Sequence, residues 1–323
     1  SSAPVNTMGT PDTVKTYYRA GQLGTLSATV ADVTSPHATG SLNPSTIYFR
    51  ILRLKDSPDK EWSVPLSTFT AAASASNLAA TEASPFWTYT TTYLSTDKLF
   101  EDGLQYQVKI FATDMVGNAG TGQSQIFRWD VSYPTAAVTV PVSTAIVNTL
   151  GVIRGTAADR DPILGDADTA ASGVTGVDVA IQSQQSGYYF NGSNFGSSGI
   201  QWLAASYDVA AGTWSYSDGD LEGQLESGRY TLSARARDTA GNIQYNFSNG
   251  VSSFTFMSDK DAPSISITKP DLPAVKPAYT PAAANAAGVQ GNSSDPLING
   301  TSSGLLTDGI DIQLWYVQLP GGT

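Results

Sequence analysis

Two stretches of the chain share one alternating pattern of apolar and polar residues. In 106–114 and again in 230–238, a tyrosine opens a run in which apolar side chains occupy every second position. A period of two is typical of a half-buried β-strand. Each run ends in Asp-x-x-Gly-Asn, beginning at Asp114 and Asp238, and these residue types favour tight turns. The pattern therefore predicts a strand that enters a hairpin turn, and it occurs twice.

Shorter runs of the same kind predict strands through the first 256 residues. The predicted strands are 23–31, 46–54, 87–93, 105–113, 124–131, 147–157, 176–183, 187–190, 193–195, 201–207, 213–216, 229–237 and 250–256. The pair Asn191-Gly192 is a hairpin signal. The Ala- and Ser-rich stretch 71–83 admits two interpretations, a short helix or a loop. Many short strands with Gly, Asn and Asp turns predict β-sandwich domains.

Prolines show that the chain is repetitive. Pro134 and Pro263 each follow an aspartate by four positions and precede another proline by seven, and Pro4 is followed by Pro11 at the same spacing. A period near 130 residues corresponds to a whole domain. We therefore predict domains at 1–133 and 134–262 and the first half of a third at 263–323. Internal matches link 29–32 with 156–159, and 153–156 with 298–301.

The third copy lacks the Tyr-to-Gly-Asn stretch. Either the natural protein continues, which we favour, or another chain completes this half. The sequence begins without Met or a basic region, which suggests a mature or excised piece.

Composition narrows the function classes. The net charge is −11, which disfavours long-range attraction to nucleic acid or anionic membranes and is compatible with cation binding. No apolar run approaches the ~18 residues of a membrane span. There are no cysteines, which excludes disulfides and thiolate metal sites.

Two segments that flank the predicted strand 229–237 resemble tandem immunoglobulin-like repeats of large bacterial surface proteins. They are Leu-Glu-Ser-Gly-Arg-Tyr at 225–230 and Asp-Thr-Ala-Gly-Asn at 238–242. The segment Tyr-Tyr-Phe-Asn-Gly-Ser at 188–193, followed by Trp202 and Trp214, resembles them too. The resemblance implies an all-β protein of sandwiches with about seven strands, and tyrosine corners at Tyr106 and Tyr230. Members of such families serve as stalks, adhesins, or parts of surface layers and fibres.

Acidic loops suggest a metal site. In such a sandwich, the loops after the second and sixth strands lie at the end where the preceding linker arrives. This would gather the following candidate calcium ligands at the joint of domains 1 and 2: Asp130, Asp159, Asp161, Asp166, Asp168, Asp238 and Asn242. Oxygen ligands from several loops suit calcium, which takes ~6–8 of them. Calcium is the only cofactor that we expect.

The other domain ends carry related residues. They are Asp32, Asp114 and Asn118 in domain 1, and Asp259, Asp261 and Asp308 around domain 3. The alternative is that Asp and Asn in Asp-x-x-Gly-Asn only hydrogen-bond their own turn. In that interpretation Asp159 lies in a solvated loop, with Arg160 as its counter-charge.

Catalytic signals are weak. His37 is the only histidine, and it lies in a stretch with loop composition, so we expect no histidine-based triad or zinc site and no enzyme activity. An aromatic group could stack on sugar rings, and we name Tyr188, Tyr189 and Trp202 as candidate ligand-binding residues. The competing interpretation is that these rings pack onto the sandwich.

The function predicted from the sequence is a structural spacer in a long extracellular bacterial surface protein, with a fibre or surface-layer subunit as the more specific version. The alternatives are an adhesin or carbohydrate-binding module, and a non-catalytic region of a large secreted enzyme. The expected partners are further repeats of the same chain or other copies of it, with surface glycans for the adhesin.

Overall fold

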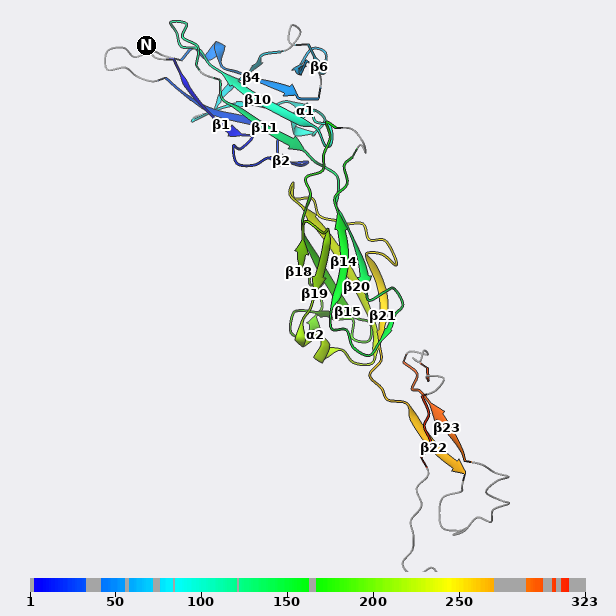
Figure 1. Cartoon of the computed structure of the whole chain (residues 1–323). Helices are drawn as coiled ribbons and strands as arrows, with labels where there is room; N and C mark the ends of the chain where they lie inside the picture. Colours follow the sequence, from blue (N-terminus) through cyan, green and yellow to red (C-terminus); the bar gives the residue numbers. More distant parts are fainter. Residues whose placement is uncertain are drawn as a thin grey trace, which may run out of the picture.

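The computed structural model describes residues 3–32, 42–55, 58–71, 76–83, 85–120, 122–162, 167–269, 289–298, 304–305 and 309–313. Figure 1 shows two β-sandwiches that follow one another end to end, with a two-stranded sheet beyond them. Helical structure in the described part is limited to the short elements η1 (Pro44–Thr46), α1 (Thr92–Ser95) and α2 (Gly219–Gln224). The chain is therefore an all-β protein of tandem sandwich domains.

The first sandwich consists of two sheets with immunoglobulin-like strand order, in which all strand pairs but one are antiparallel. One sheet has the order β1-β3-β9-β8, and the other has the order β2-β11-β10-β4-β5-β6, with β7 also on β4. Their bounds are β1 Val5–Thr10, β2 Tyr17–Tyr18, β3 Leu26–Ala31, β4 Tyr48–Arg53, β5 Lys60–Ser63, β6 Thr68–Thr70, β7 Leu78–Ala79, β8 Thr81–Ala83, β9 Phe86–Tyr89, β10 Gln105–Phe111 and β11 Ser124–Trp129. The pairing of β2 with β11 is parallel.

The second sandwich repeats this plan with the order β12-β14-β19-β18-β15-β20-β21-β13, and its extra hairpin β16–β17 is attached to β15. The bounds are β12 Thr135–Val140, β13 Ile146–Val147, β14 Ile153–Ala158, β15 Val174–Ser183, β16 Tyr189–Phe190, β17 Phe195–Ser197, β18 Leu203–Asp208, β19 Thr213–Tyr216, β20 Gly228–Asp238 and β21 Ser253–Ser258. As in the first sandwich, a short strand (β13) pairs in parallel with the last one (β21).

Strand β18 passes from one layer to the other. Its first half, Leu203 to Ala205, pairs with β15, whereas its second half, Ser206 to Asp208, pairs with β19. The first sandwich uses β7 and β8 in the same way, because β7 pairs with β4 and β8 pairs with β9. In the described part of the stretch 71–83, residues 78–79 and 81–83 therefore form strands, which neither interpretation from sequence predicted.

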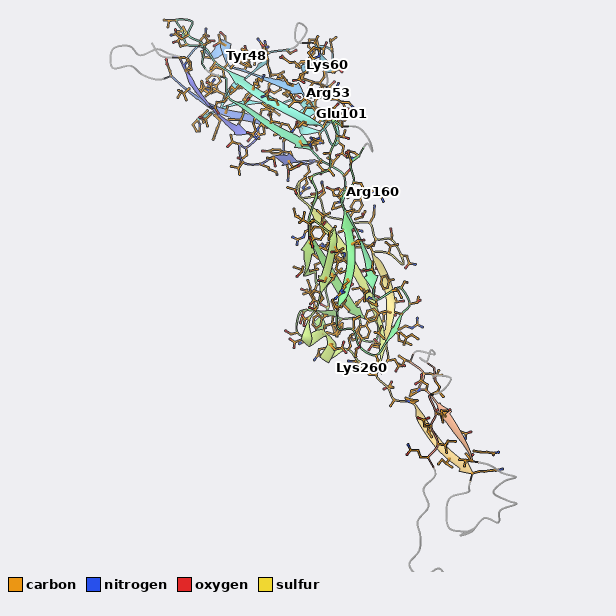
Figure 2. The ribbon with its side chains drawn as sticks, viewed as in Figure 1. Tyr48, Arg53, Lys60, Glu101, Arg160 and Lys260 are labelled. Atoms are coloured by element: carbon orange, nitrogen blue, oxygen red, sulfur yellow. The ribbon has the colours of Figure 1, made fainter. Side chains whose placement is uncertain are left out.

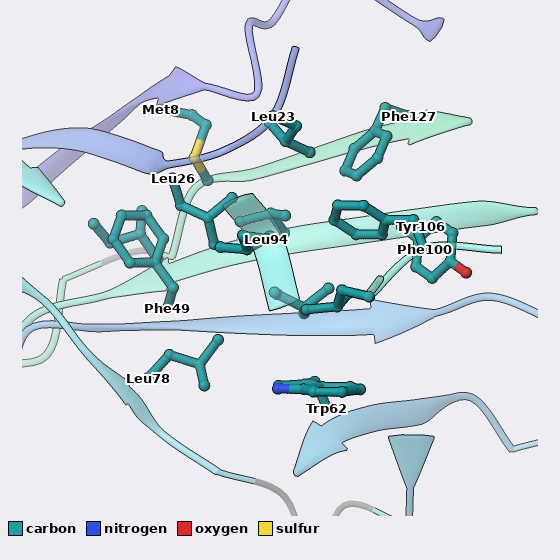
Figure 3. Packing of buried hydrophobic residues seen from close by; sticks show 14 of the residues in the cluster. Met8, Leu23, Leu26, Phe49, Trp62, Leu78, Leu94, Phe100, Tyr106 and Phe127 are labelled. Atoms are coloured by element: carbon teal, nitrogen blue, oxygen red, sulfur yellow. The ribbon is translucent and has the colours of Figure 1, made fainter. Parts of the chain in front are cut away.

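The two sandwiches have separate hydrophobic cores. Figure 3 shows the first, where side chains from β1, β4, β10 and β11 meet between the sheets around Phe49, Tyr106 and Phe127. The second core includes Trp214, Leu232 and Phe256. Apolar residues of β20 alternate strictly with exposed or half-exposed ones, so one face of this strand is buried and the other is not. This is the arrangement that the alternating sequence pattern predicts.

Both predicted tyrosine corners are present. The hydroxyl of Tyr106 accepts a hydrogen bond of 2.8 Å from the amide of Glu101. The hydroxyl of Tyr230 accepts one of 2.9 Å from the amide of Glu226 and donates one of 3.2 Å to its carbonyl. Each ring is buried in a core while its polar end is satisfied, and this fixes the chain segment that leads into β10 or β20.

The first strand of each repeat has the same partner and register. β1 pairs with β3, β12 with β14, and β22 (Ser264–Lys269) with β23 (Gln290–Ser294), each antiparallel with a register shift near its end. Val138 lies opposite Gly155, and Ile267 lies opposite Gly291. The sequence match of 153–156 with 298–301 is therefore wrong, because β23 is the counterpart of β14. The predicted match placed Gly300 at the position of Gly155, whereas the strand pairing places Gly291 there, nine residues earlier.

The sequence analysis missed the first strand of each repeat. These strands lie between the two landmark prolines and contain small or polar residues, so their alternation is weak. It also missed the two-residue strands β2 and β13. The hairpin at Asn191-Gly192 is confirmed, with β16 and β17 on either side of a glycine at φ 98°. No helix in the described part is long and apolar enough to cross a membrane.

Candidate metal centre

Three aspartates from distant parts of the sequence meet where the second sandwich begins. Asp130 lies in the linker after β11, Asp159 follows β14, and Asp238 closes β20. One carboxylate oxygen from each lies within 4.8 Å of the others. We call these three residues the joint carboxylates. Calcium binds oxygen at ~2.3–2.6 Å, so two ligands of one ion can lie up to about 5 Å apart, and the spacing fits.

Asp238 is held by its own turn. Its Oδ1 accepts hydrogen bonds of 2.7 Å from the amides of Gly241 and Asn242, and its Oδ2 accepts one of 2.8 Å from Nδ2 of Asn242. The first copy of the motif is similar, because Oδ1 of Asp114 accepts from the amide of Asn118 at 2.8 Å. The turn interpretation is thus correct for the bonding of this motif. In the second sandwich the same turn also presents Asp238 to the other two carboxylates.

Asp130 ties the linker to the loops of the second sandwich. Its side chain is fully buried, with Oδ1 accepting from the amide of Ser132 at 3.1 Å and Oδ2 from the amide of Ser172 at 2.7 Å. Its backbone carbonyl accepts from Nδ2 of Asn242 at 3.1 Å. The linker therefore contacts the loop before β15 and the turn after β20 through a single residue.

Asp159 is the least satisfied member. Its Oδ2 accepts a hydrogen bond of 2.8 Å from the amide of Gly173, which has a φ of 83° that suits glycine. Its Oδ1 is buried and has no hydrogen-bond partner among the residues that the structure describes. A buried carboxylate oxygen without a partner is costly unless a cation or a proton satisfies it.

The electrostatics of the joint carboxylates are unfavourable when all three are ionised. Burial raises the pKa of Asp159 to about 6, and the nearby charges of Asp130 and Asp238 add to this, while the bond from Gly173 opposes it. Burial also raises the pKa values of Asp130 and Asp238. Within the described residues, no lysine or arginine forms an ion pair with any of the three. A divalent cation would supply the missing positive charge.

The other predicted ligands of this joint are placed differently. Asp161 accepts a hydrogen bond of 2.6 Å from the hydroxyl of Thr169, and Asp168 is exposed. Asn242 directs its Nδ2 at Asp130 and Asp238, so this nitrogen orients their oxygens. Asp166 lies outside the described residues. Arg160 is exposed at the end of the second sandwich that faces the first (Figure 2) and forms no ion pair in the described part.

Direct contacts also cross the joint. Arg128 of β11 donates through Nη1 to the carbonyl of Gly103 in its own sandwich and, at 3.0 Å, to the carbonyl of Asp168. The amide of Ala170 donates to the carbonyl of Gly103 at 3.1 Å. The carboxylate of Asp102 accepts from the amide of Val131 at 2.8 Å and from the hydroxyl of Ser132 at 2.6 Å. The long loop between β14 and β15 thus rests on the end of the first sandwich.

Ser172, Gly173 and Asp102 were missed by the sequence analysis. Their contributions come from backbone amides or from capping the linker, which residue type alone does not reveal. A Ser-Gly pair recurs at 303–304, and this repetition is the signal that could have identified Ser172 and Gly173.

The remaining domain ends show parts of the same arrangement. Both carboxylate oxygens of Asp32 are buried and have no hydrogen-bond partner in the described part of the chain, and Asp114 is buried in its turn. Asp259 is buried, whereas Asp261 is exposed and donates its amide to Asp259. Asp308 and the single histidine, His37, lie outside the described residues.

The aromatic candidates do not form one exposed group. Tyr188 is 45% exposed, Tyr189 is half-buried, and the neighbouring Phe190 is fully buried. Trp202 stacks on Phe247 with ring centroids 5.8 Å apart, and the guanidinium of Arg235 lies 4.2 Å from its ring centre. These contacts occupy ring surface that a stacked sugar would need.

Comparison with known proteins finds no matching family model and no similar curated protein sequence. Among solved structures, the fibronectin(III)-like modules of Clostridium thermocellum CbhA align with 79% of this chain and 94% of theirs, at 14% identity and a TM-score of 0.37. A segment of a 1.5-MDa bacterial ice-binding adhesin aligns over 80% of this chain and 64% of its own, at 15% identity and a TM-score of 0.30. The FN1–FN3 domains of chicken CNTN1 align over 82% and 71%, at 12% identity and a TM-score of 0.25.

Proposed function

We propose that this chain is a spacer segment of a long extracellular bacterial surface protein, and that a calcium ion bound by the joint carboxylates stiffens it. The observation that carries the proposal is the convergence of Asp130, Asp159 and Asp238 at the point where one sandwich meets the next. A spacer must hold its domains in a fixed line, and the joint is where such a chain would bend.

The direct contacts at the joint support a mechanical role. The bonds from Arg128 and Ala170 join the first sandwich to the loop of the second, and Asp102 holds the linker. Each neutral hydrogen bond contributes only about 1 kcal/mol net. An ion that ties the linker and two loops together would add a stronger restraint, because it binds all three segments at once.

Chemistry supports calcium over softer metals. The donors at the joint are carboxylate oxygens, which are hard ligands, and the chain has no cysteine and a single histidine. Three carboxylates from separate loops allow the variable geometry that calcium accepts, whereas magnesium demands a near-ideal octahedron. The resident groups would hold the ion: Asp159 through its free Oδ1, and Asp130 and Asp238 through the remaining lone pairs of their oxygens.

The test is a thermal melt of the full chain with calcium and with a chelator. A ligand present at 100 times its Kd stabilises the folded state by ~2.7 kcal/mol. We expect calcium at that excess to raise the Tm of the transition that includes the second sandwich by about 10 °C. Asp159→Asn should abolish the rise, and Glu82→Gln, which removes an exposed carboxylate of β8, should keep it. Equal melting curves in millimolar calcium and in chelator would contradict the proposal.

A binding module is the second candidate, favoured by exposed aromatic rings on the second sandwich. Tyr133 and Tyr245 are 51% and 62% exposed and form an edge-to-face pair with centroids 4.7 Å apart. If this sandwich binds glycans, binding on a glycan array should be lost in Tyr245→Ala and kept in Trp202→Phe. No binding by the wild-type chain would leave the spacer as the supported function.

A further inference from the structure

The joint between the second sandwich and the third repeat contains the same pair of aspartates as the first joint. Asp259 precedes Ser264 of β22 by five residues, as Asp130 precedes Thr135 of β12. Asp295 directly follows β23, as Asp159 directly follows β14. Asp308 was the residue predicted from sequence for this domain end beside Asp259 and Asp261, so Asp295 is a residue that only the strand pairing reveals.

The pairing fixes where the two residues lie. Ser264 pairs with Ser294 as Thr135 pairs with Ala158, and the register shift falls at the same place in both ladders. The hydroxyls match as well, because Ser264 Oγ donates to the carbonyl of Ser294 and Thr135 Oγ1 to that of Ala158, both at 3.3 Å. Figure 1 shows β23 running back toward the linker that carries Asp259. Asp295 therefore directly follows the residue that pairs with Ser264, as Asp159 directly follows the residue that pairs with Thr135.

Asp259 has the local bonds of Asp130. Its amide donates to the carbonyl of Val147 in β13 at 2.9 Å, as the amide of Asp130 donates to that of Tyr18 in β2 at 2.8 Å. Its Oδ1 accepts a hydrogen bond of 3.1 Å from the amide of Asp261, just as Oδ1 of Asp130 accepts one of 3.1 Å from the amide of Ser132. The amide and Oδ1 of Asp259 are therefore bonded in the same way as those of Asp130.

Asp295 has the local bond of Asp159. Its Oδ2 accepts from the amide of Gly304 at 2.8 Å, and Gly304 has a φ of 80°. The corresponding amide of Gly173 lies 2.8 Å from Asp159 Oδ2, and Gly173 has a φ of 83°. The same loop geometry therefore presents both aspartates.

One difference points to a ligand. Oδ2 of Asp130 accepts a hydrogen bond from Ser172, but Oδ2 of Asp259 has no hydrogen-bond partner within the described residues, although Asp259 is only 5% exposed. Such an oxygen is poorly solvated and retains both lone pairs for another donor or an ion.

From this correspondence we propose that Asp259 and Asp295 form a second divalent-cation site, selective for calcium by its oxygen donors, at the joint of the second and third repeats. The proposal rests on the function proposed above, because the first joint is its template. Two carboxylates give a lower ligand charge than three, so the second site binds calcium more weakly than the first. Lys260, labelled in Figure 2, also attaches this linker to the second sandwich, because its Nζ lies 3.0 Å from Glu222 Oε1 and its amide donates to the hydroxyl of Ser227.

Calcium binding to the full chain, measured by equilibrium dialysis up to millimolar calcium, tests the proposal. We expect two ions per wild-type chain, with the weaker one near the ~0.1–1 mM range of extracellular modules. Asp259→Asn and Asp295→Asn should each remove the weaker ion and leave the tighter one. Asp159→Asn should remove the tighter one, and Glu82→Gln should leave both.

The outcomes separate the two proposals. One ion in the wild type that disappears in Asp159→Asn overturns the second site and leaves the first. One ion that disappears in Asp259→Asn overturns the first site alone, and no bound ion overturns both. The wild-type count does not depend on how any variant folds. Asp259→Asn also keeps an oxygen for the bond from Asp261, so it should retain the linker structure.

Discussion

The side-chain amide of Asn242 donates a hydrogen bond of 3.1 Å to the backbone carbonyl of Asp130, 112 residues earlier in the chain. The same nitrogen lies 2.8 Å from Oδ2 of Asp238. One buried amide thus joins the turn after β20 to the linker that enters the sandwich. Through this bond, a turn motif of five residues contributes to the joint between the two sandwiches.

Without calcium, stability should fall as the pH rises from about 4 to about 6. The pKa of Asp159 is about 6 in the folded protein against 3.8 for the free side chain. Its proton therefore favours the folded state, and this contribution is lost as the pH rises through that window. Melting curves in chelator should show Tm decreasing between pH 4 and 7. Asp159→Asn should flatten this decrease, while calcium at pH 7 should restore the Tm of the wild type. A Tm that rises through the window in the wild type would show that Asp159 is not strained by its ionised neighbours.

Tyr230→Phe should destabilise the second sandwich by about 1 kcal/mol. The change removes a hydroxyl that accepts from the amide of Glu226 and donates to its carbonyl, so both backbone groups lose this partner. The free energy of unfolding can be measured by urea denaturation. Tyr188→Phe is the matched control, because the tyrosine is 45% exposed and its hydroxyl makes no hydrogen bond in the described part. Equal stability of the two variants would mean that the corner contributes nothing.

Gly155→Ala should destabilise the second sandwich by about 1–3 kcal/mol or more. A methyl group there would collide with the carbonyl of Ala137 on β12 and with the indole of Trp214, which are backbone and a buried ring. Gly151→Ala introduces the same group into open space and should be nearly neutral. Urea denaturation of both variants makes the comparison, and a neutral Gly155→Ala would indicate that β12 and β14 can move apart freely.

Gly103→Ala should loosen the joint. A Cβ at Gly103 would lie 2.6 Å from Pro162 and 3.1 Å from Thr169, both in the loop of the second sandwich. Gly21→Ala is the control, because Gly21 has a φ of 78° against 76° for Gly103 and no neighbour within 4 Å. Placing alanine in a left-handed backbone conformation costs about 1 kcal/mol of folding stability in both variants. The difference between Gly103→Ala and Gly21→Ala therefore measures the effect of the contact across the joint.

Because the chain contains no cysteine, a pair of introduced cysteines can carry spin labels to measure the joint in these two variants. Labels at Ile126 and Thr213, both exposed, report on the two sandwiches. The distance distribution should broaden in Gly103→Ala and stay unchanged in Gly21→Ala. Identical distributions would show that the loop does not restrain the joint.

The strands that could be predicted from the sequence are those in which burial of one face produces a clear alternation of apolar and polar residues. β10 and β20 alternate because one face packs in a core, and their turns contain Asp, Gly and Asn for local bonding, so both were found. The topological argument that linker and loops share one end brought Asp130, Asp159 and Asp238 together correctly. Alternation could not reveal β12 or β22, because a strand at the margin of a sandwich buries few large side chains.

The remaining errors come from features that depend on tertiary structure. Asp295 was missed because the repeat was aligned on Ile298, whereas the pairing of β22 with β23 aligns it on Gly291. Asp161 and Asp168 were grouped with the joint residues because they are close in sequence, but a loop can direct neighbouring carboxylates to different places. The side-chain contacts of Trp202 depend on the path of 243–247, which its own sequence context does not indicate.

The strand that passes between layers has a consequence for a chain built of similar domains. Neighbouring repeats are the partners with which an unpaired strand would most readily form wrong hydrogen bonds, because they are tethered at high local concentration. β18 in the second sandwich, and β7 with β8 in the first, pair with both sheets and cover the strands that would otherwise be the last of each layer on that side. On the opposite side, β12 and β13 are consecutive and divide between the two layers. Strand pairing inside each domain thereby leaves fewer unpaired strand edges for a neighbouring repeat to pair with.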